Sequence, residues 1–258
     1  YLHRALERWG DECDVVFAQH HWPTWGAQRV HRFIAEQRDL YRGLHDQTVR
    51  LMSHGLKAAE IAEHLQLPEA LAQRWHTRGY YGTVSHNVKA IVQHYLSWYD
   101  AHPANLHALP PVEAARRHVQ YMGGIDALMT KAQADFDRGE FRWVAEVMKH
   151  AVYAHPEHGP ARELAAQALE QMGYQAESAT WRNAYLLGAR EYRQGPPKPT
   201  AQMAGTALLG ALSNELLFDA LAVRLNAPRA GALAFSIRWH FTCSGEQWRS
   251  VLSNGALS

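Results

Sequence analysis

The sequence has only two cysteines, Cys13 and Cys243, among its 258 residues. Two cysteines so far apart exclude a disulfide framework and a structural zinc site built from cysteine pairs. No apolar run approaches the ~20 residues that a membrane-spanning helix requires. The 26 basic and 25 acidic residues nearly cancel, so composition gives no electrostatic reason to expect binding to nucleic acid or to an anionic membrane.

The sequence also lacks a self-sufficient catalytic motif. It contains no glycine-rich phosphate loop, no nucleophile elbow, no pair of histidines beside a glutamate at helical spacing, and no His-x-His-x-Asp-His cluster. Histidine itself is abundant, with 17 copies. Most of them lie on polar faces, and we interpret these as ordinary solvated or capping residues: His54, His64, His76, His107, His118 and His150.

Two other histidines differ because of their position. Residues 13–19, "CDVVFAQ", are short, β-branched and flanked by polar residues, which predicts a buried strand. His20 and His21 follow it, and a residue at the carboxyl end of a strand in an α/β layer faces the crevice where ligands bind. A neutral imidazole there is a good zinc ligand, and Trp22 and Trp25 could wall the site. One histidine cannot hold zinc, so a surface loop remains the alternative.

The rest of the chain is mostly helical in its periodicity. Apolar residues recur every three or four positions over 27–54, which predicts one amphipathic helix of roughly 40 Å that is closed by Gly55. Residues 57–75 predict a small helical corner without a basic DNA-reading face, with Pro68 in the first turn of its second helix. Residues 125–193 predict helical hairpins. Their small residues resemble about one and a half tetratricopeptide units: Ala165, Ala166, Ala168 and Gly173, followed by Tyr174.

Shorter signals divide the remaining sequence. Gly79 and Gly82 bracket two tyrosines in a tight loop, and Ser85 or Asn87 is expected to cap the helix that follows. Three prolines within four residues make 194–202 the clearest linker. Beyond it the pattern is first helical and then alternating, as in a small α+β domain. Because the chain starts without methionine in a helical pattern and stops after a turn-like Asn-Gly, we expect it to be a piece of a longer one.

Four blocks of sequence strongly resemble the metallo-β-lactamase-fold alkyl sulfatases, which cleave surfactants of the dodecyl sulfate type. They are "VVFAQHHWPTWG", "EQRDLYRGLHDQTVRLM", "RGYYGTVSHNVKAIVQHYLSWYDAHPANLHALPPVEAA" and "LAAQALEQMGYQAESATWRNAYLLGAREYR". The resemblance implies that residues 1–26 end a metallo-β-lactamase-like α/β catalytic domain and that 27–193 form a helical dimerisation domain. It also implies that 194–202 is a linker and 203–258 part of an α+β domain like the sterol carrier proteins. The expected fold class is therefore mainly α.

The same resemblance implies a chemistry. The complete enzyme would be a homodimer that holds two zinc ions, activates water with them and hydrolyses alkyl sulfate esters to alcohol and sulfate. In the family the last zinc ligand is the histidine that ends the strand preceding Trp-Pro, which matches His20. The adjacent His21 is the alternative, because the match can be shifted by one residue. The family's other ligands and its sulfate-binding stretch have no counterpart here, so we expect this chain alone to be inactive. Family members are often periplasmic or secreted, whereas this chain itself does not indicate a compartment.

Two readings without catalysis remain open from the residues alone. The helical hairpins suit an adaptor that binds a peptide or another protein. The apolar helix and alternating strands of 203–258 suit a module that binds a lipid tail.

Overall fold

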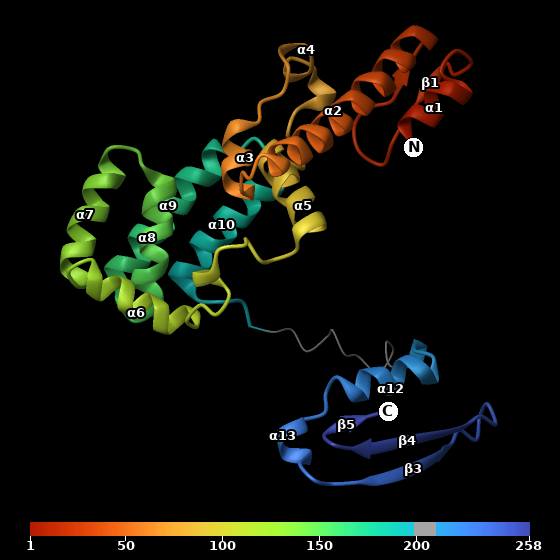
Figure 1. Cartoon of the computed structure of the whole chain (residues 1–258), viewed down its shortest axis with the longest axis vertical. Helices are drawn as coiled ribbons and strands as arrows, with labels where there is room; N and C mark the ends of the chain where they lie inside the picture. The colour runs from red at the N-terminus through yellow and green to blue at the C-terminus, as the bar shows by residue number, and fades with distance from the viewer. Residues whose placement is uncertain (199–209) are drawn as a thin grey trace. The chain divides into compact units, whose positions relative to one another are not determined.

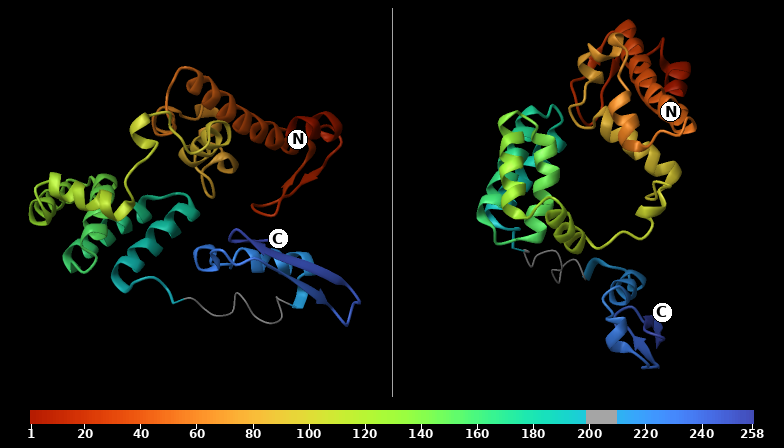
Figure 2. Two further views of the ribbon diagram at one scale, coloured as in Figure 1. Left: turned by 60° about the horizontal axis from the view of Figure 1, so that its bottom comes forward. Right: turned by 60° about the vertical axis from the view of Figure 1, so that its left-hand side comes forward.

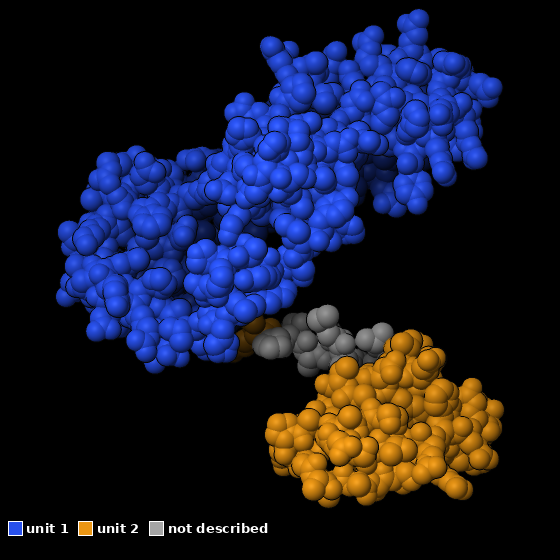
Figure 3. All heavy atoms as spheres, viewed as in Figure 1, with its two compact units in different colours: residues 1–196 blue, residues 197–258 orange. Residues whose placement is uncertain are grey.

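The structure, a computed structural model, describes residues 1–198 and 210–258. The chain divides into two compact units, which we call unit 1 (residues 1–196) and unit 2 (residues 197–258) (Figure 3). Helices make up most of unit 1, and unit 2 has a small sheet with helices (Figure 1). The prediction of a mainly helical chain with a small α+β part is therefore confirmed. The predicted linker at 194–202 lies partly outside the described residues.

Unit 1 begins with helix α1 (Leu2–Trp9) and a small hairpin, in which β1 (Val15–Val16) pairs antiparallel with β2 (Thr24–Trp25). The prediction of a buried strand over residues 13–19 is wrong, because only two residues are extended and Phe17 is 75% exposed. A two-residue ladder is too short to form a stable layer, and in the described part of the chain it gains no third strand. Its apolar side chains line a cleft instead of a core.

Helix α2 (Ala27–Ser53) confirms the predicted long helix, and its buried stripe holds Val30, Ile34, Leu44, Thr48 and Leu51. Three further helices follow it: α3 (Ala58–His64), α4 (Glu69–Ala72) and α5 (Val84–Leu96). A core of Leu51, Ile61, Val88 and Val92 joins α2, α3 and α5.

Two predicted helix starts in this region are shifted. The cap of α5 is Thr83 and not Ser85 or Asn87, since the Thr83 hydroxyl accepts a hydrogen bond of 2.9 Å from the His86 amide. Thr83 has an extended backbone, which is the usual conformation of a capping residue, whereas Ser85 and Asn87 already lie inside the helix. Pro68 directly precedes α4 and does not belong to its first turn.

The second half of unit 1 is a bundle of α6 (Pro111–Tyr121), α7 (Ile125–Asp137), α8 (Phe141–Ala154), α9 (Gly159–Gln175) and α10 (Ala179–Gln194) (Figure 2). Its core is centred on Val144 and Met148 of α8, both fully buried. Ala165 and Ala168 of α9 are buried in the same core. The predicted helical hairpins are thus present.

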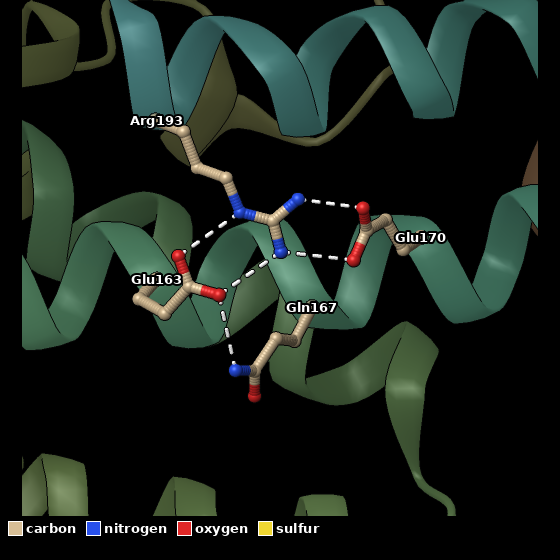
Figure 4. A network of polar contacts seen from close by, with 4 residues as sticks. All are labelled: Glu163, Gln167, Glu170 and Arg193. Carbon is tan, nitrogen blue, oxygen red and sulfur yellow. Dashed lines mark hydrogen bonds and ion pairs between the residues drawn. The ribbon is translucent and has the colours of Figure 1, made fainter.

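An ion-pair network fixes the end of α10 on α9 (Figure 4). The Arg193 guanidinium donates to Glu163 at 2.9 and 3.0 Å and to Glu170 at 2.5 and 2.8 Å. Gln167 donates a further hydrogen bond of 3.1 Å to Glu163. These hydrogen bonds from Arg193 hold the pKa of both glutamates below its ordinary value.

Unit 2 contains α12 (Asn214–Ala222), α13 (Ala227–Ala230) and an antiparallel sheet. The strands β3 (Phe235–His240), β4 (Gln247–Ser253) and β5 (Ala256–Leu257) are ordered β3-β4-β5. The Phe218 ring of α12 lies against Trp239 and Trp248, with centroid distances of 5.6 and 5.5 Å. The alternating strands are confirmed, whereas the predicted helical stretch 208–230 begins at two residues, 208 and 209, that lie outside the described residues. None of the helices in the described part has the length and apolar character of a membrane span.

Candidate functional site

Unit 1 contains a cleft of about 830 Å³ between α1, the hairpin, α2 and the segment that precedes α5. Most of its lining surface is apolar and includes Phe17, Phe33 and Tyr41, and its polar side chains include His20, His21 and His76. This volume and this combination of apolar walls with polar groups are typical of ligand sites. The cleft is therefore the candidate functional site of the described residues.

The two predicted site histidines lie in the loop between β1 and β2, where both are exposed. The His20 ring stacks on the Tyr81 ring, with 5.6 Å between centroids and 26° between planes. The His21 ring meets the edge of Trp75 at 5.5 Å and the Tyr80 ring at 6.1 Å. His21 also has a φ of 72°, a conformation that is uncommon for a residue other than glycine and that recurs at functional sites.

The structure thus joins two motifs that lie 60 residues apart in the sequence. The tyrosines that contact the histidines belong to the loop between Gly79 and Gly82, to which sequence reasoning assigned no role. A Cβ on Gly79 would lie 3.0 Å from the Gly82 carbonyl oxygen, and one on Gly82 would lie 3.0 Å from Asn87 Oδ1. A side chain at either glycine would therefore be tightly packed in this compact loop, which places the two tyrosine rings beside His20 and His21.

One histidine that we interpreted as solvated is buried under this site. The His76 side chain is 9% exposed, and its Nε2 atom lies 2.8 Å from Glu36 Oε2. Arg74 Nε lies 3.1 Å from the other Glu36 oxygen, and Gln37 donates a hydrogen bond of 2.6 Å to the His76 carbonyl. Burial lowers the pKa of His76, and the neighbouring Glu36 carboxylate opposes that shift only in part. Periodicity missed this residue because it lies in the short helical turn η1 (Trp75–Thr77) that packs on α2.

The donor chemistry of the two exposed imidazoles suits zinc, which binds histidine nitrogen at about 2.0–2.1 Å. A zinc ion nevertheless requires three or four protein ligands. Among the residues that the structure describes, no three His, Cys, Asp or Glu side chains come together in a way that could hold a metal. The described residues therefore fit a contribution to a metal site and not a complete one.

Comparison with known families identifies the helical part of the chain. Residues 57–195, more than half of the sequence, match the family described as alkyl sulfatase dimerisation. The chain belongs to the alkyl sulfatase family. Residues 202–258 match a second family, described as alkyl sulfatase C-terminal. The resemblance inferred from the four sequence blocks is confirmed.

Relatives among the alkyl sulfatases match over the whole chain. The chain is 52% identical to alkyl/aryl-sulfatase BDS1 of Saccharomyces cerevisiae and covers 40% of it. It is 44% identical to a linear primary-alkylsulfatase of Pseudomonas sp., of which it covers 38%. The solved structure of the stereoselective inverting sec-alkylsulfatase Pisa1 from Pseudomonas sp. superposes on all of this chain with a TM-score of 0.94 at 40% identity, over 41% of its own length. The chain thus spans about 40% of the length of these alkyl sulfatases.

Proposed function

We propose that this chain supplies the dimerisation and C-terminal parts of a zinc-dependent alkyl sulfatase that hydrolyses alkyl sulfate esters to an alcohol and inorganic sulfate. The observation that carries this proposal is the identity of 44–52% over the entire chain to proteins named as sulfatases of alkyl esters. Identity at this level supports a shared reaction. Since about 60% of each relative lies beyond the match, the rest of the catalytic machinery would come from sequence outside this chain.

In this proposal residues 1–26 close a metallo-β-lactamase-like catalytic domain and His20 supplies one zinc ligand, with His21 as the alternative. Zinc, when bound, would supply the Lewis acid for attack on the ester. Of the chain's own residues, Tyr81 contacts this ligand, since its ring stacks on the His20 imidazole. Trp75 and Tyr80 contact the neighbouring His21 ring and add apolar surface beside that histidine.

Sulfate release and metal content test this proposal together. The full-length protein that carries this chain is expected to bind two zinc ions per chain and to release sulfate from dodecyl sulfate. The 258-residue chain alone is expected to release none, because its described residues bring no three metal-ligating side chains together. The measurements are elemental analysis of the purified proteins and ion chromatography of the product. A metal-free full-length protein, or turnover by the isolated chain, would contradict the proposal.

The second part of the proposal is a symmetric homodimer, which rests on the match of residues 57–195 to a dimerisation family. The described surface supports the dimer, since the large aromatic side chains of Trp143 and Tyr153 on α8 are 49% and 43% exposed. A second copy of the chain could bury them. Obligate dimers bury more than about 2,000 Å² and are rich in aromatic side chains. Sedimentation equilibrium of the full-length protein is expected to give twice the chain mass down to nanomolar concentration. A mass of one chain at micromolar concentration would exclude the dimer.

A further inference from the structure

The corner between α9 and α10 holds the loop that contacts the two histidines. The Tyr81 carbonyl accepts hydrogen bonds from the Ser178 hydroxyl at 2.7 Å and from the Thr180 hydroxyl at 2.6 Å. The neighbouring Tyr80 carbonyl accepts one of 2.8 Å from the Ala179 amide. These bonds join residues that lie 97 to 99 positions apart in the sequence.

Two further contacts reinforce this anchor. Arg78 Nη2, at the start of the loop, lies 2.6 Å from Glu177 Oε1. Behind the loop, Trp181 Nε1 donates a hydrogen bond of 3.1 Å to His86 Nδ1 in the first turn of α5. The backbone of the loop is therefore bound by three consecutive residues at the start of α10, Ser178 to Thr180. The two tyrosine side chains extend from this anchored backbone to the histidines, where the Tyr81 ring stacks on His20 and the Tyr80 ring contacts His21.

Ser178 and Thr180 have different parts in this arrangement. Ser178 is 1% exposed and caps α10, since its oxygen also accepts from the Trp181 amide at 3.4 Å. Replacing Ser178 would therefore damage the helix and the anchor together. The Thr180 hydroxyl bonds to Tyr81 and lies 3.0 Å from the Ser178 hydroxyl, and Thr180 is otherwise exposed. Thr180 is the residue at which the anchor can be changed with the least effect on the cap.

We infer that Ser178 and Thr180 are positioning residues, which hold the Tyr80–Tyr81 loop so that its rings form the edge of the substrate site beside His20 and His21. The inference rests on the proposed function, because that function makes the cleft at His20 the place of ester hydrolysis. The new element of the inference is that Ser178 and Thr180, which belong to the dimerisation region and do not touch the substrate, set the position of the Tyr80–Tyr81 loop. Small displacements of positioned groups are costly, since an error of about 1 Å can reduce a rate by up to about 100-fold.

The test uses the full-length protein with Thr180→Val, which keeps the shape of the side chain and removes its hydroxyl. We expect KM for dodecyl sulfate to rise on the order of tenfold, with kcat changed less, because the loop shapes the binding edge and holds no reacting group. Hydrogen exchange of a peptide spanning 78–84 is expected to accelerate severalfold, while the zinc content and the melting temperature stay those of the wild type.

Two matched variants separate positioning from general stability. Thr180→Ser retains the hydroxyl and is expected to restore the wild-type KM and exchange rate. Thr130→Val removes a threonine hydroxyl that, among the described residues, bonds to the Asp126 carbonyl of its own helix at 3.0 Å, and is expected to change neither. Should the valine variant fail to fold, Glu177→Gln weakens the ion pair with Arg78 and is expected to raise KM in the same direction.

Wild-type KM and wild-type exchange in Thr180→Val would overturn the inference, as would equal effects of Thr180→Val and Thr130→Val. The proposed function has its own test: it is wrong if the wild-type full-length protein releases no sulfate. In that case the exchange measurement still decides whether Thr180 orders the loop.

Discussion

Replacing His20 with alanine in the full-length protein is expected to remove zinc and to lower sulfate release from dodecyl sulfate by at least about 100-fold. Loss of a residue that merely orients a metal ligand already costs about 10–100-fold in metal affinity or activity, and loss of the ligand itself costs more. The described residues contain no group of three possible ligands that could hold the metal without the rest of the enzyme. The measurements are zinc per chain and the rate of sulfate release.

The matched control is His21→Ala, one residue further along the same loop. Its ring lies against Trp75 and Tyr80, so we expect a local loss of packing with nearly full zinc content. If His21 is the ligand, the two variants exchange their effects. If both variants retain full zinc and full turnover, neither histidine binds the metal and this part of the proposal is wrong.

Local pattern was sufficient for most of the fold. The 3.6-residue period located α2 and the helices of the bundle, and alternation located β3 and β4, because each pattern depends on residues that are close together in the sequence. The prediction of a strand at 13–19 was wrong because a buried strand depends on partners that are distant in the sequence. A buried strand needs neighbouring strands to pair with, and Val15–Val16 pairs only with Thr24–Trp25 in the described chain.

The site was predicted less completely than the fold. His20 and His21 could be selected from the sequence because they follow an apolar run and precede Trp-Pro. Their neighbours could not, since Tyr81 reaches His20 only through the folding of α2 and the residues that follow it. The Ser178 and Thr180 hydroxyls are further still from Tyr81 in sequence, and the only local signal was that Ser178 precedes a helix.

Gly173→Val is the change expected to destabilise unit 1 most clearly. Gly173 of α9 is buried where α10 approaches, and a Cβ there would lie 2.9 Å from both Cγ and Cδ2 of Leu186. The branched side chain must therefore push α10 away or force Leu186 out of its place, which typically costs about 1–3 kcal/mol. We expect a lower midpoint in urea unfolding of the chain, followed by far-UV circular dichroism.

Gly43→Ala is the control for the glycine itself. Gly43 lies in the interior of α2, and a Cβ there would meet nothing within 4 Å among the described residues. Alanine is expected to raise the unfolding free energy by about 0.5–1 kcal/mol, because it favours the helix without a clash. Equal midpoints for Gly173→Val and the wild type would show that α9 and α10 are not closely packed at this point.

Gly173→Val is expected to affect the candidate site as well as the stability of unit 1. Gly173 lies five residues before Ser178, so a displacement of α10 at Leu186 would also shift the start of that helix, where Ser178 and Thr180 bind the Tyr81 carbonyl. Gly173→Val is therefore expected to accelerate exchange over 78–84 as Thr180→Val does, but with a lower melting temperature. A destabilised protein whose loop exchanges at the wild-type rate would mean that the anchor tolerates movement of the helix that carries it.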